Sequence, residues 1–364
     1  MNDEYYMRKA FELAKKGRGH VSPNPLVGAV LVKNGKIIGQ GYHEFYGKAH
    51  AEKNAIENAR ESVEGASLYC NLEPCSHVGK QPACVDLLIE KKIKRVIVSN
   101  LDNNPKVDSI KKLKDAGIEV KLGVLEEEGK KLNQIFFYNM KYKRPLVALK
   151  YAMTMDGKIA ANTSDSKWIS GEKSRHFVHE LRSLYDAILV GKNTVEKDNP
   201  RLSSRIEGGV DSVRIILDTN FELSEDMKIF NLESDAKTYI ATISDKKRPE
   251  LKAEVLRCKE KDGRVDIKDL CQKLYQMKIG SILVEGGASV NNSFLEENLV
   301  DKIYEFISPQ IISGYKSKSP FYGKGVDYIK DSYKFKFVDL KIFDQDIMIE
   351  ADNVYWNIWR NRKN

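Results

Sequence analysis

Apolar positions along the first 120 residues alternate between helical and strand-like spacing. Residues 4–16 carry apolar side chains three and four positions apart, which predicts a helix. The continuous apolar run 26–32 predicts a buried strand, and Asn34-Gly35 after it predicts a type I′ hairpin turn. Beyond the turn, the pattern predicts strands at 37–38, 66–72, 95–99 and 118–121, and helices at 50–60, 84–91 and 109–116. Strands interleaved with helices in this order imply a mixed sheet covered by helices.

A second domain is expected after residue 144. The charged stretch 141–145 ends in proline, and a new apolar strand begins at 146, so we predict domains at 1–144 and 145–364. The two halves do not resemble each other, and the chain shows no solenoid repeat. The second half is again α/β, with strands predicted at 146–152, 187–190, 213–217, 238–241, 281–284 and 303–307, and helices at 172–183, 267–277 and 289–298.

Composition narrows the class of protein. The chain has 364 residues, of which 41% are hydrophobic, enough to fill two cores without disulfides. Its net charge is +8, but the 60 basic and 52 acidic residues are interspersed, which argues against a nucleic-acid-binding surface. The N-terminus lacks the features of a signal peptide, and no apolar run is long enough to span a membrane, so we expect a cytoplasmic protein.

Two of the five cysteines belong to a pattern typical of a catalytic metal site. His50-Ala51-Glu52 is followed by Pro74-Cys75 and then by Cys84. One imidazole and two thiols are one ligand fewer than a closed structural zinc site uses, so a water can take the fourth position. This order matches the signature of zinc nucleobase deaminases, in which Glu52 would be the proton shuttle. We therefore expect one zinc ion per chain.

For His50, Cys75 and Cys84 to bind one metal, the helices and strands that carry them must bring the three side chains together. Residues two apart on a helix point to nearly opposite sides, so His50 is expected in the first, irregular turn of its helix. Cys84 is expected to open a helix, and Cys75 to follow a strand at its carboxyl end. Two alternatives remain. The histidine and the cysteines are unrelated, or His77 closes a structural zinc site and leaves Glu52 without a role.

Three segments carry a family resemblance. The stretch 73–84, with eight residues between the two cysteine ligands, resembles the riboflavin-biosynthesis pyrimidine deaminase rather than deaminases with a Pro-Cys-x-x-Cys spacing. Segments 3–7 and 23–28 resemble it too, and the likeness continues through the second half. The resemblance is to the bifunctional riboflavin-biosynthesis deaminase/reductase family. It implies an N-terminal cytidine-deaminase-like α/β/α domain with a mixed sheet and a C-terminal dihydrofolate-reductase-like α/β domain.

The resemblance also implies a first reaction and its substrate contacts. The family's deaminase hydrolyses the 2-amino group of 2,5-diamino-6-ribosylamino-4(3H)-pyrimidinone 5′-phosphate to give 5-amino-6-(5-phosphoribosylamino)uracil. Asn24 would read a base edge and Lys80 would meet the phosphate, whereas His43 and His77 are either pocket residues or structural histidines. The chain departs from the family pattern at 102–109, where it is shorter, which leaves the shape of this loop and its substrate contacts open.

Four segments of the second half resemble the family's reductase domain: 150–160, 166–170, 191–202 and 284–289. Gly286-Gly287 before a helix can offer backbone N–H groups to a phosphate. Lys150 would polarise the sugar carbonyl as NADPH reduces the ribosyl group to ribityl, or be structural. The resemblance implies that NADPH contacts Ala152, Trp168, Ser170, Thr194, Asp198, Thr219, Gly287, Ala288, Ser289, Val290, Asn291, Asn292 and Ser293. It implies that substrate contacts Ser166, Arg182, Leu202, Arg205 and Glu285.

Two other functions compete with this hypothesis. One is a zinc deaminase of another nucleobase whose reductase-like domain is inactive. The other is a zinc-stabilised nucleic-acid-binding protein, which would need a basic face and a fourth metal ligand and would be indifferent to Glu52→Ala. The expected partners are small phosphorylated pyrimidines, with no nucleic acid and no membrane. Association into a homo-oligomer through the reductase domain is also expected.

Overall fold

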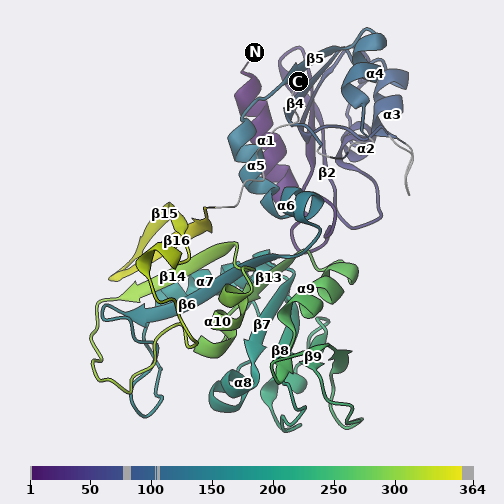
Figure 1. The fold of residues 1–364 in the computed structure, drawn as a ribbon. Coiled ribbons are helices and arrows are strands. Elements are labelled where there is room, and N and C mark those ends of the chain that lie inside the picture. The colour runs from purple at the N-terminus through teal and green to yellow at the C-terminus, as the bar shows by residue number, and fades with distance from the viewer. Residues whose placement is uncertain (1, 77–82, 103, 105–106, 355–364) are drawn as a thin grey trace. The chain divides into compact units, whose positions relative to one another are not determined.

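The computed structural model describes residues 2–76, 83–102, 104 and 107–354. Contacts within the chain divide it into two compact units, Met1–Lys143 and Arg144–Asn364 (Figure 1). Both units are α/β, as the sequence pattern predicts. None of the described helices is long and apolar enough to cross a membrane.

The first unit is built on a five-stranded sheet in the order β2-β1-β3-β4-β5. β1 is antiparallel to β2 and β3, whereas β3, β4 and β5 are parallel to one another. The sheet is therefore mixed, as predicted. The strands are β1 (Gly28–Lys33), β2 (Lys36–Tyr42), β3 (Ser67–Leu72), β4 (Arg95–Asn100) and β5 (Glu119–Leu122). The helices are α1 (Asp3–Lys15), α2 (Ala51–Glu57), α3 (Cys84–Glu90), α4 (Ser109–Asp115), α5 (Glu126–Leu132) and α6 (Gln134–Tyr142).

Helices cover both faces of this sheet. On one face, α1 places Met7 and Phe11 against Val30 and Tyr69. On the other, apolar residues of α2, α3 and α4 pack with Leu31 and its neighbours. The hairpin between β1 and β2 has positive φ at Asn34 (50°) and Gly35 (75°), which confirms the predicted type I′ geometry. Helices α5 and α6 were not predicted.

Two glycines let α2 lie directly on β2. A Cβ added at Gly39 would stand 2.3 Å from the carbonyl oxygen of Ala55, and one at Gly41 would stand 2.3 Å from its nitrogen. Side chains at these positions would push the helix away from the strand. The close approach therefore fixes the position of the first turn of α2, where two of the candidate site residues lie.

The second unit contains a nine-stranded sheet in the order β10-β9-β8-β7-β13-β6-β14-β16-β15. The strands from β10 to β14 in this order are parallel, and β16 and β15 add an antiparallel edge. The strands are β6 (Leu146–Thr154), β7 (Ala187–Gly191), β8 (Val213–Leu217), β9 (Thr238–Thr242), β10 (Glu254–Arg257), β13 (Ser281–Val284), β14 (Lys302–Ser308), β15 (Phe335–Phe343) and β16 (Asp346–Asn353), with the small pair β11 (Glu260–Lys261) and β12 (Arg264–Val265) apart.

The helices of this unit also cover two faces of its sheet. Residues of α9 and α10 pack with Val147 and Leu149 of β6 in one core cluster. Phe177 of α7 meets Phe306 of β14 on the opposite face, and Val195 of α8 packs with Ile188 there. The helices are α7 (Glu172–Leu184), α8 (Lys192–Asp198), α9 (Ile267–Gln276) and α10 (Ala288–Glu296), with 3₁₀ turns at Lys228–Phe230 and Ile329–Asp331.

The six strands and three helices predicted in this half are present, but other elements were missed. Helix α8 is only seven residues long, and β10, β11 and β12 are shorter still. The hairpin β15–β16 lies at the edge of the sheet, where β15 is exposed along most of its length. Its apolar and polar residues alternate on either side of Val338, but the extra residue at the register shift interrupts the pattern.

Candidate functional sites

Three side chains far apart in the sequence meet in the first unit. His50 is the N-cap of α2 with an extended backbone, Cys84 is the first residue of α3, and Cys75 follows β3. The Nδ1 atom of His50 lies 3.4 Å from each sulfur, and the three ligand atoms lie within 4.8 Å of one another. A tetrahedral zinc ion would separate its nitrogen and sulfur ligands by about 3.6 Å. The three residues therefore fit a zinc ion.

Glu52 lies beside this cluster and is 3% exposed. Its Oε2 atom is buried and has no hydrogen-bond partner among the described residues. Burial raises the pKa of this carboxyl, and the nearby Cys75 raises it further. A carboxyl group with a raised pKa and a free oxygen is suited to accept a proton and pass it on.

The electrostatics of the two cysteines also suit a cation. A hydrogen bond from the Cys84 thiol lowers the pKa of Cys75, and the same bond raises the pKa of Cys84. The backbone N–H of Cys84 also donates to the Cys75 sulfur over 3.2 Å. Without a metal, Cys75 therefore loses its proton readily and Cys84 keeps its own. A divalent ion bound to both sulfurs would stabilise both as thiolates.

A further histidine and an asparagine lie next to the cluster. The rings of His43 and His50 are 5.5 Å apart. Nδ1 of His43 donates to the carbonyl of Ala49 over 3.0 Å, which leaves Nε2 to accept from the Asn24 amide at 3.1 Å. Burial lowers the pKa of His43, which favours this neutral form. His77 and Lys80 lie outside the described residues, so the structural-zinc alternative through His77 stays untested.

The segment 102–109, where the sequence departs from the family pattern, is tied to the loop that carries Cys75. The buried carboxylate of Glu73 accepts from the hydroxyl of Ser109 at 2.7 Å and from the N–H of Asp102 at 3.1 Å. The N–H of Asp108 donates to the Ser76 hydroxyl over 2.8 Å. These bonds hold both ends of the segment against the metal-ligand loop.

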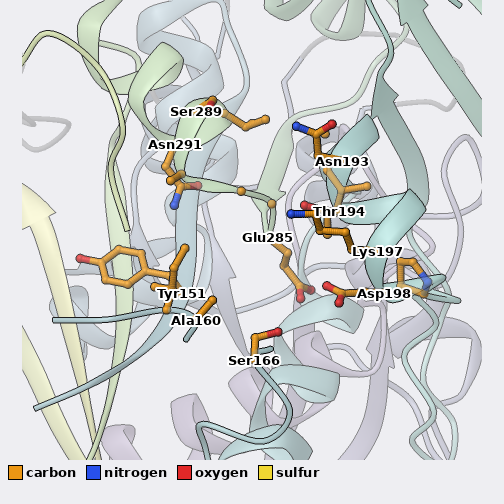
Figure 2. A pocket seen from close by; sticks show the side chains of 18 of the residues that line it. Tyr151, Ala160, Ser166, Asn193, Thr194, Lys197, Asp198, Glu285, Ser289 and Asn291 are labelled. Carbon is orange, nitrogen blue, oxygen red and sulfur yellow. The ribbon is translucent and has the colours of Figure 1, made fainter. Parts of the chain in front are cut away.

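The second unit contains a cavity of about 1310 Å³ at the carboxyl ends of its parallel strands (Figure 2). Gly286 and Gly287 lie between β13 and α10, and a Cβ at Gly286 would stand 2.7 Å from the Cα of Val190. Asn291 of α10 donates to the carbonyl of Pro320, while its buried Oδ1 has no partner among the described residues. The volume and this free acceptor fit a dinucleotide cofactor with a substrate beside it.

An ion pair and a lysine form the polar floor of this cavity. Arg182 of α7 donates to both oxygens of Glu285 at 2.6 and 2.8 Å. Although burial would raise it, the pKa of Glu285 is lowered by this guanidinium. Burial lowers the pKa of Lys150, whose ammonium lies 5.8 Å from the Phe306 ring. Lys150 can therefore give up a proton more easily than a solvated lysine.

The structure gathers nearly all of the predicted reductase-site residues around this one cavity. The loop after α8 has unusual backbone geometry, with positive φ at Leu202 (56°) and Arg205 (53°). Asn292 does not line the cavity, because its buried side chain lies where a Cβ at Gly323 would stand. The predicted residues that line it are Lys150, Ala152, Ser166, Trp168, Ser170, Arg182, Thr194, Asp198, Leu202, Arg205, Thr219, Glu285, Gly287, Ala288, Ser289, Val290, Asn291 and Ser293.

Several residues of the cavity wall were not predicted from the sequence. Tyr151, Asn193 and Lys197 each lie next to a predicted residue, and Figure 2 draws them among the residues that line the cavity. Arg175 of α7 and Lys318 also line it. No local pattern in the sequence points to Arg175, because Trp168 precedes α7 and helical spacing does not relate the two residues.

Comparisons with known proteins cover almost the whole chain. Residues 1–100 match the cytidine and deoxycytidylate deaminase zinc-binding region, and residues 145–349 match the RibD C-terminal domain. The riboflavin biosynthesis protein RibD of Actinobacillus pleuropneumoniae is 44% identical, covering 96% of this chain and 95% of its own. RibD of Aquifex aeolicus is 43% identical over 95% of this chain and 97% of its own.

Solved structures agree with these similarities. A diaminohydroxyphosphoribosylaminopyrimidine deaminase/5-amino-6-(5-phosphoribosylamino)uracil reductase from Thermotoga maritima is 41% identical, with a TM-score of 0.86 over 96% of this chain and 98% of that one. RibD of Acinetobacter baumannii is 34% identical, with a TM-score of 0.85 over 97% and 99% of the two chains. The likeness therefore includes both units.

Removal of one sulfur ligand is expected to abolish metal binding. Cys84→Ser should reduce the zinc content of the purified protein from about one ion per chain to near zero, because a neutral hydroxyl is a poor zinc ligand. Metal analysis after gel filtration measures this. Cys258→Ser is the matched control and should keep its zinc. Full zinc content in the Cys84 variant would show that Cys84 is not a ligand.

Proposed function

This chain belongs to the RibD family of riboflavin-biosynthesis enzymes, and we propose how its residues divide the family's two reactions between the two units. The protein is a bifunctional enzyme, a zinc-dependent deaminase and an NADPH-dependent reductase. We assign deamination to residues 1–144 and reduction to residues 145–364. The observation that carries the first assignment is the cluster of His50, Cys75 and Cys84 with the buried Glu52 beside it.

In the deaminase unit, the substrate is the diamino-ribosylamino-pyrimidinone 5′-phosphate and the products are the aminouracil and ammonia. Bound zinc lowers the pKa of a water molecule, so that it is a nucleophile at neutral pH. Glu52 takes a proton from that water and delivers it to the departing amino group. Asn24, fixed by His43, presents its remaining amide atoms to the pyrimidine edge. We assign Lys80 to the phosphate and His77 to the pocket wall.

In the reductase unit, the substrate is 5-amino-6-(5-phosphoribosylamino)uracil, whose ribosyl group becomes ribityl. Bound NADPH supplies the hydride. Lys150, with its lowered pKa, donates to the sugar oxygen that gains electron density as C1′ is reduced. The Glu285 and Arg182 pair holds the substrate beside Lys150, and Arg205 offers a planar donor to its phosphate. Gly286-Gly287 and the start of α10 face the cofactor pyrophosphate.

The alternative of a deaminase with an inactive reductase-like unit is not favoured. The relatives named RibD cover both halves of the chain, and the cavity of the second unit has a charged floor of Lys150, Arg182 and Glu285. The zinc-stabilised nucleic-acid-binding alternative gains no support either. Among the described residues, no fourth metal ligand joins His50, Cys75 and Cys84.

We also propose that the protein forms a homo-oligomer through its second unit. The edge strand β15 exposes large apolar side chains, with Phe337 80%, Leu340 59% and Ile342 69% exposed. An edge strand with such a surface invites pairing with another chain, and a second copy offers the same strand.

A cytoplasmic location stays a prediction, supported by five cysteines that are all free.

Replacement of the proton shuttle is expected to remove one activity alone. Glu52→Gln should lower ammonia release roughly 100- to 10,000-fold, because the amide cannot accept the proton. NADPH oxidation with the deaminated substrate should stay at the wild-type rate, and so should zinc content. Both rates are measured on the same preparation. Ammonia release at the wild-type rate would contradict the assignment of Glu52.

The converse variant tests the second site. Lys150→Ala should lower the rate constant for NADPH oxidation at saturating substrates by about 100-fold or more, because the developing charge on the sugar oxygen loses its donor. Ammonia release serves as the internal control. A loss seen only as a raised KM for the sugar phosphate would assign Lys150 to binding instead of catalysis.

Introducing charged residues into the edge strand β15 tests whether the protein associates through this strand. Leu340→Glu with Ile342→Glu should shift the mass measured by light scattering to that of one chain of 41.5 kDa, because buried like charges repel. Lys341→Glu on the same strand changes charge without removing an apolar group and is the control. A wild-type protein that is itself monomeric at all concentrations would refute the proposal.

A further inference from the structure

The loop between β6 and α7 presents an unusually exposed tryptophan to the reductase cavity. Trp168 is 66% exposed although it lines the cavity wall, and Ser166 and Ser170 of the same loop line it too. An indole so exposed loses freedom when a ligand orders it, and that loss weakens binding. A group that holds the indole in place beforehand would therefore strengthen binding.

Arg175 is placed to hold the indole of Trp168. The guanidinium carbon lies 4.5 Å from the centroid of the Trp168 ring, within the range of a cation–π contact. The same guanidinium donates through Nη1 to the carbonyl of Ser170 at 2.6 Å. Arg175 thus contacts both the side chain of Trp168 and the backbone two residues later. Among the described residues Arg175 makes no ion pair with a carboxylate, and its guanidinium contacts Trp168 and Ser170 of this loop.

The start of α7, from which Arg175 projects, is itself anchored. The buried carboxylate of Asp346 in β16 accepts from the N–H of Gly171 at 2.7 Å and from the hydroxyl of Ser174 at 2.6 Å. Gln310 donates to the carbonyl of Ile169 over 3.0 Å. The base of the arginine is therefore fixed to the sheet, and its far end determines where the indole lies.

We propose that Arg175 is a positioning residue of the reductase, which stacks on one face of Trp168 and holds the other face ready for the flat ring of the nicotinamide cofactor. This inference rests on the proposed reductase function of the second unit. Arginine suits the task because its planar group stacks and donates at once, whereas a lysine ammonium does not stack as a plane. Arg175 acts on the cofactor through Trp168.

The test separates cofactor affinity from chemistry. Arg175→Ala should raise the KM for NADPH roughly five- to twentyfold, because a cation–π contact and a hydrogen bond are lost, while kcat changes less than about threefold. Arg175→Lys should be intermediate. Lys173→Ala, on the same turn and outside the cavity wall, is the matched control and should match wild type. Ammonia release from the same chain reports an intact first unit.

A spectroscopic measurement reads the indole directly. The chain has three tryptophans, so Trp356→Phe with Trp359→Phe leaves Trp168 alone. In this background, Arg175→Ala should lower the fluorescence anisotropy of Trp168 in the absence of NADPH. Should the alanine variant fail to fold, Arg175→Gln is judged by the same two measurements.

The outcomes distinguish this inference from the function on which it rests. A raised KM for NADPH together with lowered anisotropy supports it. A raised KM with unchanged anisotropy overturns it, because the arginine would then bind the cofactor by charge. Wild-type values for both quantities also overturn it and leave the reductase assignment standing. A wild-type protein that does not oxidise NADPH with the deaminated substrate removes the proposed function and the inference with it.

Discussion

Both sites depend on the cost of burying a carboxylate. Glu52 and Glu285 are each almost fully removed from water, where an unpaired negative charge is strongly disfavoured. The two units meet this cost differently. Glu285 is paired on both oxygens with Arg182, which keeps it charged. Glu52 has one oxygen unpartnered and a raised pKa, so it is the carboxyl group that can exchange a proton. One group is fixed in charge to organise a cavity, and the other is left free to react.

Parallel strands explain why residues so distant in sequence reach these sites. In the first unit, β3 and β4 end at the same edge, so Glu73 after one strand lies near Asp102 after the next. In the second unit, β6, β7, β8 and β13 end together around one cavity. The helices that follow these strands then begin at the site. Cys84 uses such a helix start after β3 and Gly287 after β13, whereas His50 precedes α2, which follows β2.

Prediction from the sequence succeeded where one local rule decides the structure. The position of His50 followed from the geometry of a helix, and the turn at Asn34-Gly35 followed from the need for positive φ. Two kinds of feature were beyond reach. The alternation of apolar and polar residues in β15 is interrupted at Val338, where the pairing with β16 shifts register, and that shift depends on the partner strand. The contact of Arg175 with Trp168 depends on a tertiary anchor, Asp346, that follows it by 171 residues and has no signal in the local sequence.

The close approach of the α2 backbone to Gly39 and Gly41 of β2 limits which substitutions these two positions can tolerate. Gly39 and Gly41 are not among the residues assigned to the metal or the substrate, yet any larger residue would displace the helix that carries His50 and Glu52. Selection on deaminase activity must therefore act on these two codons nearly as strictly as on those of the ligands. In a survey of tolerated substitutions they would group with the catalytic residues. Inspection of the active site alone would not explain why.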